Sequence, residues 1–376
     1  MKVSIITYTR TKNYGGILQA YGLYDYLRNE GYECEFIDYI PERSNIYNKE
    51  VFTRNYVSRS RFWGHNFLFT KIWQVLFYKK MVKSYEPFRN FIDTNTKLSR
   101  AYNSEAELEE NPPCGDVYIT GSDQVWNSDF NEKGKLDIPY YLGFINNVKK
   151  ISYASSFGKS SIPEHNKKLV FDYLSRYEHL SVRESSGKQI LSQIGLDSAV
   201  VVDPTVLCGL PTWNKLVKSI SENNYILLYQ VKFNQSLYQM TCDISKKLNK
   251  KMIIISINQN DSRRITYGKV VRASVPEWIS YIKYADYIIT DSFHASVFSI
   301  LFHKRFLVDI ESRAGMSSRI TDLLEMTKLE KQACKSYSIS EAINLLDHDM
   351  DWMQSDLSID QARKKSQEWL INAINN

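Results

Sequence analysis

The stretch Thr290-Asp291-Ser292-Phe293-His294-Ala295-Ser296-Val297-Phe298-Ser299 joins a predicted strand to a predicted helix. The apolar run Tyr287-Ile288-Ile289 before it is typical of a buried strand, and apolar residues at helical spacing follow it. Asp291 or Ser292 is a suitable N-cap, which places His294 in the first helical turn. Free backbone N–H groups and the helix dipole favour anions there. His294 is therefore predicted to contact an anionic ligand and to exchange a proton with it; a packed or capping histidine is the alternative.

The composition is that of a soluble globular protein, with 43% hydrophobic and 24% charged residues. A length of 376 residues favours two domains. The 26 tyrosines suit polar grooves such as those that bind sugars, although tyrosine also serves surface packing. No apolar run is long enough to span a membrane, and residues 1–8 lack the features of a signal peptide, so we expect a cytoplasmic protein. The five cysteines are scattered without metal-type spacing, which favours reduced thiols.

Residues 51–100 carry a concentrated positive charge. They hold ten Lys and Arg against two acids, an excess of +8, whereas the whole chain has +6. Aromatic residues lie among these charges, including Phe62, Trp63, Phe67, Phe69, Trp73, Phe77 and Tyr78. We predict a basic, aromatic helical insert at about 50–100 that contacts the inner face of an anionic membrane or approaches a diphosphate-linked acceptor. Amphipathic helices with solvated charges are the alternative. No nucleic-acid module accompanies the segment, so no nucleic-acid partner is expected.

The first part of the chain begins with a strand, a loop and a helix. Residues 3–8 form the predicted strand, residues 9–16 the loop and residues 17–30 the helix. The adjacent Gly15 and Gly16 let the backbone approach a ligand closely, and Asn13 offers a polar side chain beside them. The spacings of a dinucleotide fingerprint or a P-loop are absent. The pattern indicates the start of a Rossmann-like domain.

Two later strand ends carry polar side chains. The predicted strand 116–120 ends in Gly121-Ser122-Asp123-Gln124-Val125-Trp126-Asn127, and ligands bind at the carboxyl ends of parallel strands. Asp123 is a candidate base, or a cap for the next helix, and Ser122 and Gln124 are candidate ligand contacts. Arg183 follows another predicted strand and could hold a carboxylate or phosphate. A surface position beside Glu184 is the alternative for Arg183.

Alternating strands and helices continue after the Asp203-Pro204 turn, which implies a second, mostly parallel sheet. We therefore predict an α/β protein with two Rossmann-like domains facing across a cleft. The predicted limits are 1–207 for the first domain, on the acceptor side, and 208–345 for the second, on the donor side. A helical tail is predicted over 346–376, with its last helix at 361–374. Domain closure would bring the candidate residues of both domains together.

Five motifs occur in series. They are Asn13-Tyr14-Gly15-Gly16-Ile17-Leu18-Gln19-Ala20, Gly121-Ser122-Asp123-Gln124-Val125-Trp126-Asn127, Ser181-Val182-Arg183-Glu184, Asp203-Pro204-Thr205 and Asp291-Ser292-Phe293-His294. In this order and spacing the chain resembles the polysaccharide pyruvyl transferase family over about residues 1–310. The resemblance implies a GT-B-like fold and transfer of the pyruvyl group of phosphoenolpyruvate to a sugar of a bacterial surface polysaccharide or its precursor.

The resemblance also implies roles for individual residues. The family's histidine and arginine in donor binding and catalysis correspond to His294 and Arg183. Some members have an arginine where this chain has Ser292, so one donor-binding charge is unaccounted for; Lys304 and Arg305 are near in sequence. Asp123 is the candidate base, and Asn13, Gly15, Gly16, Ser122, Gln124 and Ser292 are candidate substrate contacts.

The reaction that the resemblance implies needs phosphoenolpyruvate as donor substrate, with no cofactor and no metal, since no residue cluster has ligand spacing. The acceptor is a saccharide, either free or linked to a lipid. Two alternatives remain open from the sequence. One is a GT-B-type glycosyltransferase that uses a nucleotide sugar, and the other is a non-catalytic binding protein of the same fold.

Overall fold

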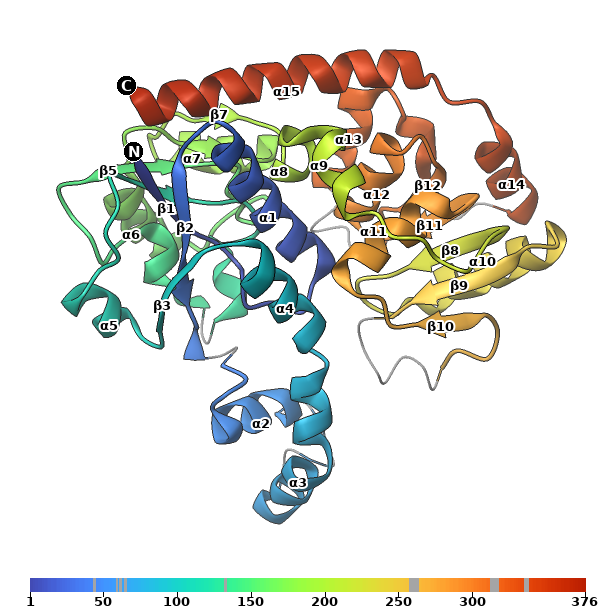
Figure 1. The fold of residues 1–376 in the computed structure, drawn as a ribbon, viewed down its shortest axis with the longest axis horizontal. Coiled ribbons are helices and arrows are strands. Elements are labelled where there is room, and N and C mark those ends of the chain that lie inside the picture. The colour runs from blue at the N-terminus through green and yellow to red at the C-terminus, as the bar shows by residue number, and fades with distance from the viewer. Residues whose placement is uncertain are drawn as a thin grey trace.

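The computed structural model describes residues 1–42, 45–58, 60, 63, 66–131, 134–256, 264–311, 318–334 and 338–376. Two parallel sheets lie side by side, each with helices on its faces, and a long C-terminal helix runs across both (Figure 1). The predicted α/β architecture of two Rossmann-like units is confirmed. No helix among these residues is long and apolar enough to cross a bilayer.

The first sheet has the strand order β3-β2-β1-β4-β5. Its strands are β1 (Lys2–Ile6), β2 (Glu33–Tyr39), β3 (Leu98–Tyr102), β4 (Val117–Thr120) and β5 (Lys149–Ser152). All neighbouring pairs are parallel. The order reverses between β1 and β4, and ligands of such sheets bind beyond the carboxyl ends of the strands at this point. A short pair, β6 (Ser181–Val182) and β7 (Ala199–Val200), continues beyond β5 through isolated bridges.

Helix α1 (Tyr14–Asn29) starts earlier than the sequence predicted. Gly15 and Gly16, expected in a loop, lie in its first turn. Asn13 is the N-cap, and its side chain accepts a hydrogen bond from the Gly16 N–H at 3.3 Å. Capping outweighs the low helix propensity of the two glycines at this position. The other helices of this part are α5 (Glu105–Glu110), α6 (Glu164–Leu174) and α7 (Ser185–Gln193), with 3₁₀ turns at Ser128–Phe130 and Ile138–Tyr141.

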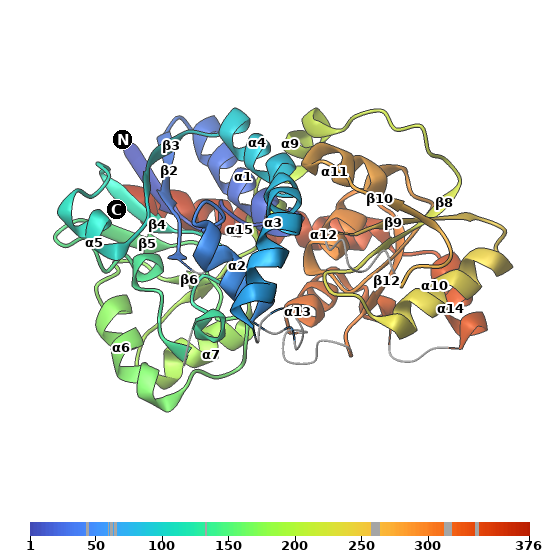
Figure 2. The same cartoon turned by 90° about the horizontal axis from the view of Figure 1, so that it is seen from below.

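The predicted helical insert consists of α2 (Lys49–Val57), α3 (Phe67–Lys83) and α4 (Glu86–Asn95). Helices α2 and α3 project from the body of the molecule, below the junction of its two halves (Figures 1 and 2). They share a small apolar cluster of their own, which includes Phe52, Trp73 and Met81. Several of the aromatic residues noted in the sequence thus pack between these helices.

The second sheet has the order β10-β9-β8-β11-β12-β13. Its strands are β8 (Tyr225–Tyr229), β9 (Lys251–Ile255), β10 (Lys269–Val271), β11 (Tyr287–Thr290), β12 (Arg305–Asp309) and β13 (Ala333–Cys334). Its helices are α10 (Gln235–Lys247), α11 (Val275–Tyr284), α12 (Phe293–Leu301), α13 (Ser318–Thr327) and α14 (Ile339–Asp347), with a 3₁₀ turn at Glu330–Gln332. Here the order reverses between β8 and β11, directly before α12.

Two short helices, α8 (Pro204–Leu207) and α9 (Gly209–Leu216), connect the sheets. The C-terminal helix α15 (Trp352–Asn375) is longer than the predicted 361–374. It begins against the second sheet's helices and ends on the core of the first, which contains Leu370 and Ile374 (Figure 1). The domain limits at 207 and 345 stay predictions.

Candidate active site between the two sheets

The first turns of α1 and α12 touch each other. Ser292 is the N-cap of α12 and accepts a hydrogen bond from the Ala295 N–H at 3.3 Å, which confirms His294 in the first turn. A Cβ placed on Gly15 would lie 1.9 Å from His294 Nδ1. Gly15 is therefore required because any side chain would occupy the space of the imidazole. The two predicted halves of the site thus meet at this contact.

Asp203 lies at the centre of the site with its side chain fully buried. Its Oδ2 accepts hydrogen bonds from Arg183 Nη1 at 2.7 Å and Ser122 Oγ at 3.2 Å, and it lies 3.6 Å from His294 Nε2. Its Oδ1 accepts from the N–H and hydroxyl of Thr205 at 2.9 and 2.6 Å. Burial opposes its charge, but His294 and Arg183 outweigh burial and hold the pKa of Asp203 well below its ordinary value.

Arg183 is buried among three carboxylates. Besides Asp203, its Nη2 lies 3.7 Å from Asp123 Oδ1 and its Nε lies 3.6 Å from Glu184 Oε2. Burial disfavours the guanidinium charge, but these acids more than compensate and raise the pKa of Arg183. The surface alternative for Arg183 is wrong, because its side chain is only 2% exposed.

Asp123 follows β4 with a left-handed backbone, at φ 76°. Such a conformation is uncommon for a residue other than glycine and is concentrated at functional sites. Its Oδ1 accepts from the Gln124 N–H at 2.9 Å, and its Oδ2 lies 3.2 Å from the position a Cβ on Gly16 would take. Gly16 therefore lets α1 approach the carboxylate that the sequence marked as a base.

The other predicted contacts divide into two groups. Ser122, Asn13 and Ser292 lie at the site, where they bind Asp203 or cap the two helices. Gln124 is different, since its amide oxygen accepts from Asn127 Nδ2 at 2.9 Å and packs against Gly158. Gln124 therefore supports the loop after β4.

Arg319 and Phe293 join the site without having been predicted. The Phe293 ring lies between two guanidinium groups, with Arg183 Cζ 5.1 Å and Arg319 Cζ 5.8 Å from its centroid. Arg319 belongs to the first turn of α13 and is 8% exposed. Nothing local in the sequence distinguishes it, because only the tertiary fold brings α13 to α12.

The sequence shows Asp203 and Glu184 only as parts of motifs and does not predict them as site residues. The sequence predicts a turn at a domain boundary for Asp203-Pro204. In the structure, Asp203 caps α8 and its second oxygen faces the site. The capping pattern of Asp before Pro was the signal that could have placed it at a helix start.

Lys304 and Arg305 do not supply the missing donor charge. Both follow the C-terminus of α12, at the opposite end of the helix from His294. Arg305 instead pairs with Asp347 at 3.4 Å and Asp349 at 3.1 Å.

Three buried nitrogen atoms in the site make no hydrogen bond within the described residues. They are Arg183 Nε, Arg183 Nη2 and His294 Nε2. Unsatisfied buried polar atoms are costly and infrequent in native proteins. Each of them lies 3.6–3.7 Å from a carboxylate oxygen, too far for a good hydrogen bond, so a ligand with acceptor oxygens could still bind them where the first turns of α1 and α12 meet.

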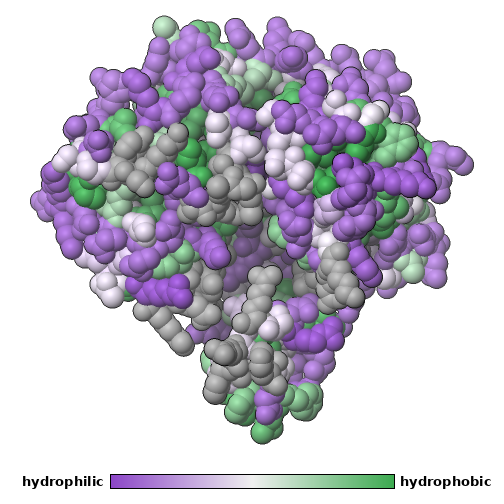
Figure 3. Space-filling view, turned by 180° about the vertical axis from the view of Figure 1, so that it is seen from behind, coloured by the Kyte–Doolittle hydropathy of each residue, from purple (hydrophilic) through white to green (hydrophobic). Residues whose placement is uncertain are grey.

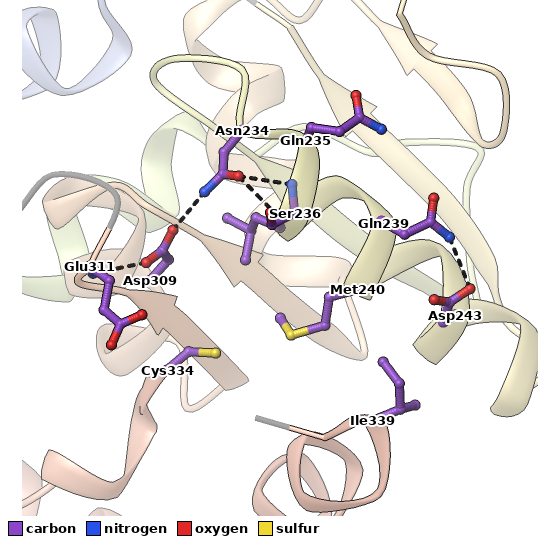
Figure 4. A pocket seen from close by; sticks show the side chains of 11 residues that line it. Asn234, Gln235, Ser236, Gln239, Met240, Asp243, Asp309, Glu311, Cys334 and Ile339 are labelled. Atoms are coloured by element: carbon purple, nitrogen blue, oxygen red, sulfur yellow. Dashed lines mark hydrogen bonds between the residues drawn. The ribbon is translucent and has the colours of Figure 1, made fainter. Parts of the chain in front are cut away.

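The face opposite to that of Figure 1 is hollowed between the two halves, and hydrophilic side chains line the hollow (Figure 3). A separate pocket of about 810 Å³ lies beside the N-terminus of α10 and the end of β12 (Figure 4). Its described lining contains Asp243, Asp309 and Glu311 but no Lys or Arg, so it does not suit an anionic donor. Across the described residues, no group of three or more His, Cys, Asp or Glu side chains is placed to hold a metal ion.

The protein has two parallel sheets, and its candidate site lies between the points at which their strand orders reverse. This arrangement defines a GT-B-type protein. Solved structures agree on the fold: a UDP-GlcNAc 2-epimerase of Methanocaldococcus jannaschii in complex with UDP-GlcNAc and UDP has a TM-score of 0.52 at 13% identity, covering 100% of this chain and 99% of the epimerase. The S. aureus protein MnaA with UDP has a TM-score of 0.54 at 12% identity, covering 99% of this chain and 95% of MnaA. No curated protein matches the sequence. The chain belongs to the polysaccharide pyruvyl transferase family, which it matches over residues 13–308.

Proposed function

We propose that this protein transfers the pyruvyl group of phosphoenolpyruvate to two hydroxyl groups of a saccharide, forming a ketal and releasing phosphate. The saccharide belongs to a bacterial surface polysaccharide or its precursor. Family membership supports a pyruvyl transferase of polysaccharide biosynthesis. The main support for phosphoenolpyruvate as the donor comes from the buried nitrogen atoms of Arg183 and His294 that make no hydrogen bond. Phosphoenolpyruvate offers a carboxylate and a phosphate as acceptors for them.

The proposed reaction has two additions. Protonation of the methylene carbon of phosphoenolpyruvate makes its C2 electrophilic, and the first hydroxyl oxygen bonds to C2 as it loses its proton. The second hydroxyl oxygen then bonds to C2 while the C2–O bond to phosphate breaks. One hydroxyl proton balances the proton added to carbon, the other balances the phosphate that leaves, and no oxidant or cofactor enters.

The proposed roles follow the positions of the residues. His294 binds the donor phosphate at the N-terminus of α12 and is the candidate acid. Arg183 holds the donor with its Nε and Nη2. Asp123 accepts hydroxyl protons from the saccharide, which approaches from the first domain, while the donor lies on the side of the second. Asp203 positions Arg183 and His294.

We also propose a peripheral position on the inner face of the membrane. Helix α3 exposes Leu68, Ile72, Val75 and Leu76, and their spacing places them on one face. The opposite side of α3 buries Trp73 and Met81 against the insert. Basic residues flank the exposed apolar face, as in helices that lie on anionic bilayers.

Purified protein with phosphoenolpyruvate and a saccharide tests the reaction. We expect inorganic phosphate and a new ketal methyl signal by NMR. His294→Gln should lower the rate by about 10²–10⁴-fold, the range for a lost general acid. The matched control is His303→Gln, since His303 is exposed and pairs with Asp356.

Two outcomes would contradict the proposal. Release of UDP from a UDP-sugar without phosphate release from phosphoenolpyruvate would favour a glycosyltransferase. Equal thermal stabilisation of the wild type and the His294→Gln variant by phosphoenolpyruvate would show that His294 is not a donor ligand.

A further inference from the structure

A basic pocket of about 240 Å³ lies beside the candidate active site. Four cations line it: Lys12, Lys80, Lys83 and Arg272. We call it the cationic pocket. Its volume leaves room for several water-sized groups.

The cationic pocket is built where three parts of the chain meet. Lys12 lies in the loop between β1 and α1, Arg272 follows β10, and Lys80 and Lys83 belong to the last turns of α3. Loops after parallel strands are where ligands of α/β sheets bind. Both sheets and the insert therefore contribute to one pocket.

Tyr14 connects the cationic pocket to the active site. It lines the pocket, its hydroxyl donates to the Ala273 carbonyl at 2.6 Å, and its ring stacks on Trp278 at 5.4 Å. The next residue, Gly15, packs against His294. A ligand in the pocket is thus separated from the active site by the first turn of α1.

The charge of the cationic pocket is not balanced. Its described lining includes no carboxylate, and none of its four cations forms an ion pair within the part of the chain that the structure describes. Lys12 Nζ donates to Ser84 Oγ at 2.9 Å and lies over the Tyr85 ring. Burial, and then the charge of Arg272, lower the pKa of Lys12 to about 8. A bound anion would relieve this repulsion.

We propose that the cationic pocket binds the diphosphate of a lipid-linked saccharide acceptor, an inference that rests on the proposed pyruvyl transfer. Its four cations more than neutralise the two negative charges of a diphosphate that is joined to a lipid and a sugar, and such a sugar would lie beside the first turn of α1, next to the active site. The lipid is favoured because Lys80 and Lys83 follow Leu76 at i+4 and i+7, continuing the exposed apolar face of α3. A polyprenyl chain on that face and a diphosphate in the pocket would form one continuous path.

Calorimetric titration of the full-length protein with inorganic diphosphate tests the pocket itself. Lys83→Gln and Arg272→Gln should each weaken binding by about threefold to tenfold, as expected for the loss of one typical hydrogen bond. Lys79→Gln, on the same helix but outside the pocket lining, should leave it unchanged. Equal effects of Lys79 and Lys83, or loss of binding only in Arg183 or His294 variants, would overturn the proposal.

Transfer assays identify the source of the diphosphate. With a polyprenyl-diphosphate-linked saccharide, Lys83→Gln should raise KM about threefold to tenfold and leave kcat near the wild-type value. With the same saccharide free in solution, both parameters should be unchanged. An equal rise in KM for a UDP-linked saccharide would assign the pocket to nucleotide diphosphates and refute the lipid.

The two proposals fail in different ways. If the wild type releases no phosphate from phosphoenolpyruvate with any acceptor, the proposed function is wrong. The diphosphate titration gives its result independently of that reaction.

Discussion

At the scale of single residues, Gly15 is the most constrained position of the site. Alanine in place of glycine within a helix ordinarily stabilises by about 0.5–1 kcal/mol. Here the added Cβ would lie 1.9 Å from His294 Nδ1, so the imidazole or α1 must move. A displacement of about 1 Å can cost about 100-fold in rate. We expect Gly15→Ala to lose pyruvyl transfer by about that factor, measured as phosphate release.

Gly187→Ala is the matched control for this change. Gly187 lies in α7, and its nearest neighbour for a Cβ is the Val182 side chain at 3.2 Å. The Val182 side chain has to shift by only a few tenths of an ångström to admit the methyl group, so this variant should keep most of its activity. Full activity of Gly15→Ala would show that the contact between α1 and His294 does not position the catalytic group.

Arg319 is the best candidate for the charge that Ser292 does not supply. It shares the Phe293 ring with Arg183, at 5.8 and 5.1 Å, and comes from the first turn of a neighbouring helix. Arg319→Gln should raise KM for phosphoenolpyruvate by about tenfold or more, because hydrogen bonds to charged groups contribute about 1.5–3 kcal/mol. Arg305→Gln, whose partners are Asp347 and Asp349, should not change KM. The reverse order of effects would refute the assignment.

Asp203 makes stability depend on pH. Its pKa is depressed in the folded protein, so its contribution is fully present above the unfolded carboxyl value of about 3.9 and is lost as pH falls below it. Asp203→Asn removes a buried partner of Arg183 and should cost about 3–5 kcal/mol near pH 7. Urea unfolding of both proteins should show this difference shrinking below pH 4. A constant difference would mean that the charge of Asp203 is not what stabilises the site.

At the scale of elements, the sequence predicted the strand before His294, the helix after it and a cap at Asp291 or Ser292, because each depends on local pattern. It misplaced the start of α1, since the glycines have low helix propensity and the cap that holds them in the first turn is Asn13. It also could not assemble Asp203 with Arg183, because that ion pair joins residues from separate motifs. Features that depend on neighbouring residues in the sequence were thus predictable, whereas contacts between separate helices and motifs were not.

Helix α3 illustrates an element with two apolar sides, of which the fold buries one. Val75 and Leu76 remain 75% and 60% exposed. Burial of each such side chain contributes about 1.5–3 kcal/mol. Val75→Glu and Leu76→Glu should therefore each weaken binding to anionic vesicles by at least about tenfold in a flotation assay.

The control for α3 is Leu357→Glu on α15, where the leucine is 52% exposed. It adds the same charge at a distant apolar position and should leave vesicle binding unchanged. If the three variants behave alike, the effect is one of net charge and α3 is not the membrane-binding element.

At the scale of the whole molecule, α15 joins the two halves. Its start lies against the second half, where the Trp352 ring stacks on His303 at 5.0 Å. Its middle donates hydrogen bonds from Arg363 and Gln367 to the Val206 and Leu207 carbonyls of α8, at 2.8 and 3.1 Å. Its end packs into the core of the first sheet. Because Asp203 is the N-cap of α8, α15 also fixes the segment that carries the central carboxylate of the site.

This arrangement predicts that the two sheets unfold together. Leu370 is fully buried in the core of the first sheet, and Leu370→Ala should cost about 2–5 kcal/mol. If α15 couples the halves, hydrogen exchange should accelerate in β11 of the second sheet as well as in β4 of the first. Leu357→Ala, on the exposed face of the same helix, should change stability by no more than about 0.5 kcal/mol. Faster exchange confined to the first sheet would show that the halves are independent, and the geometry at His294 would then depend on the contacts of α1 and α12 alone.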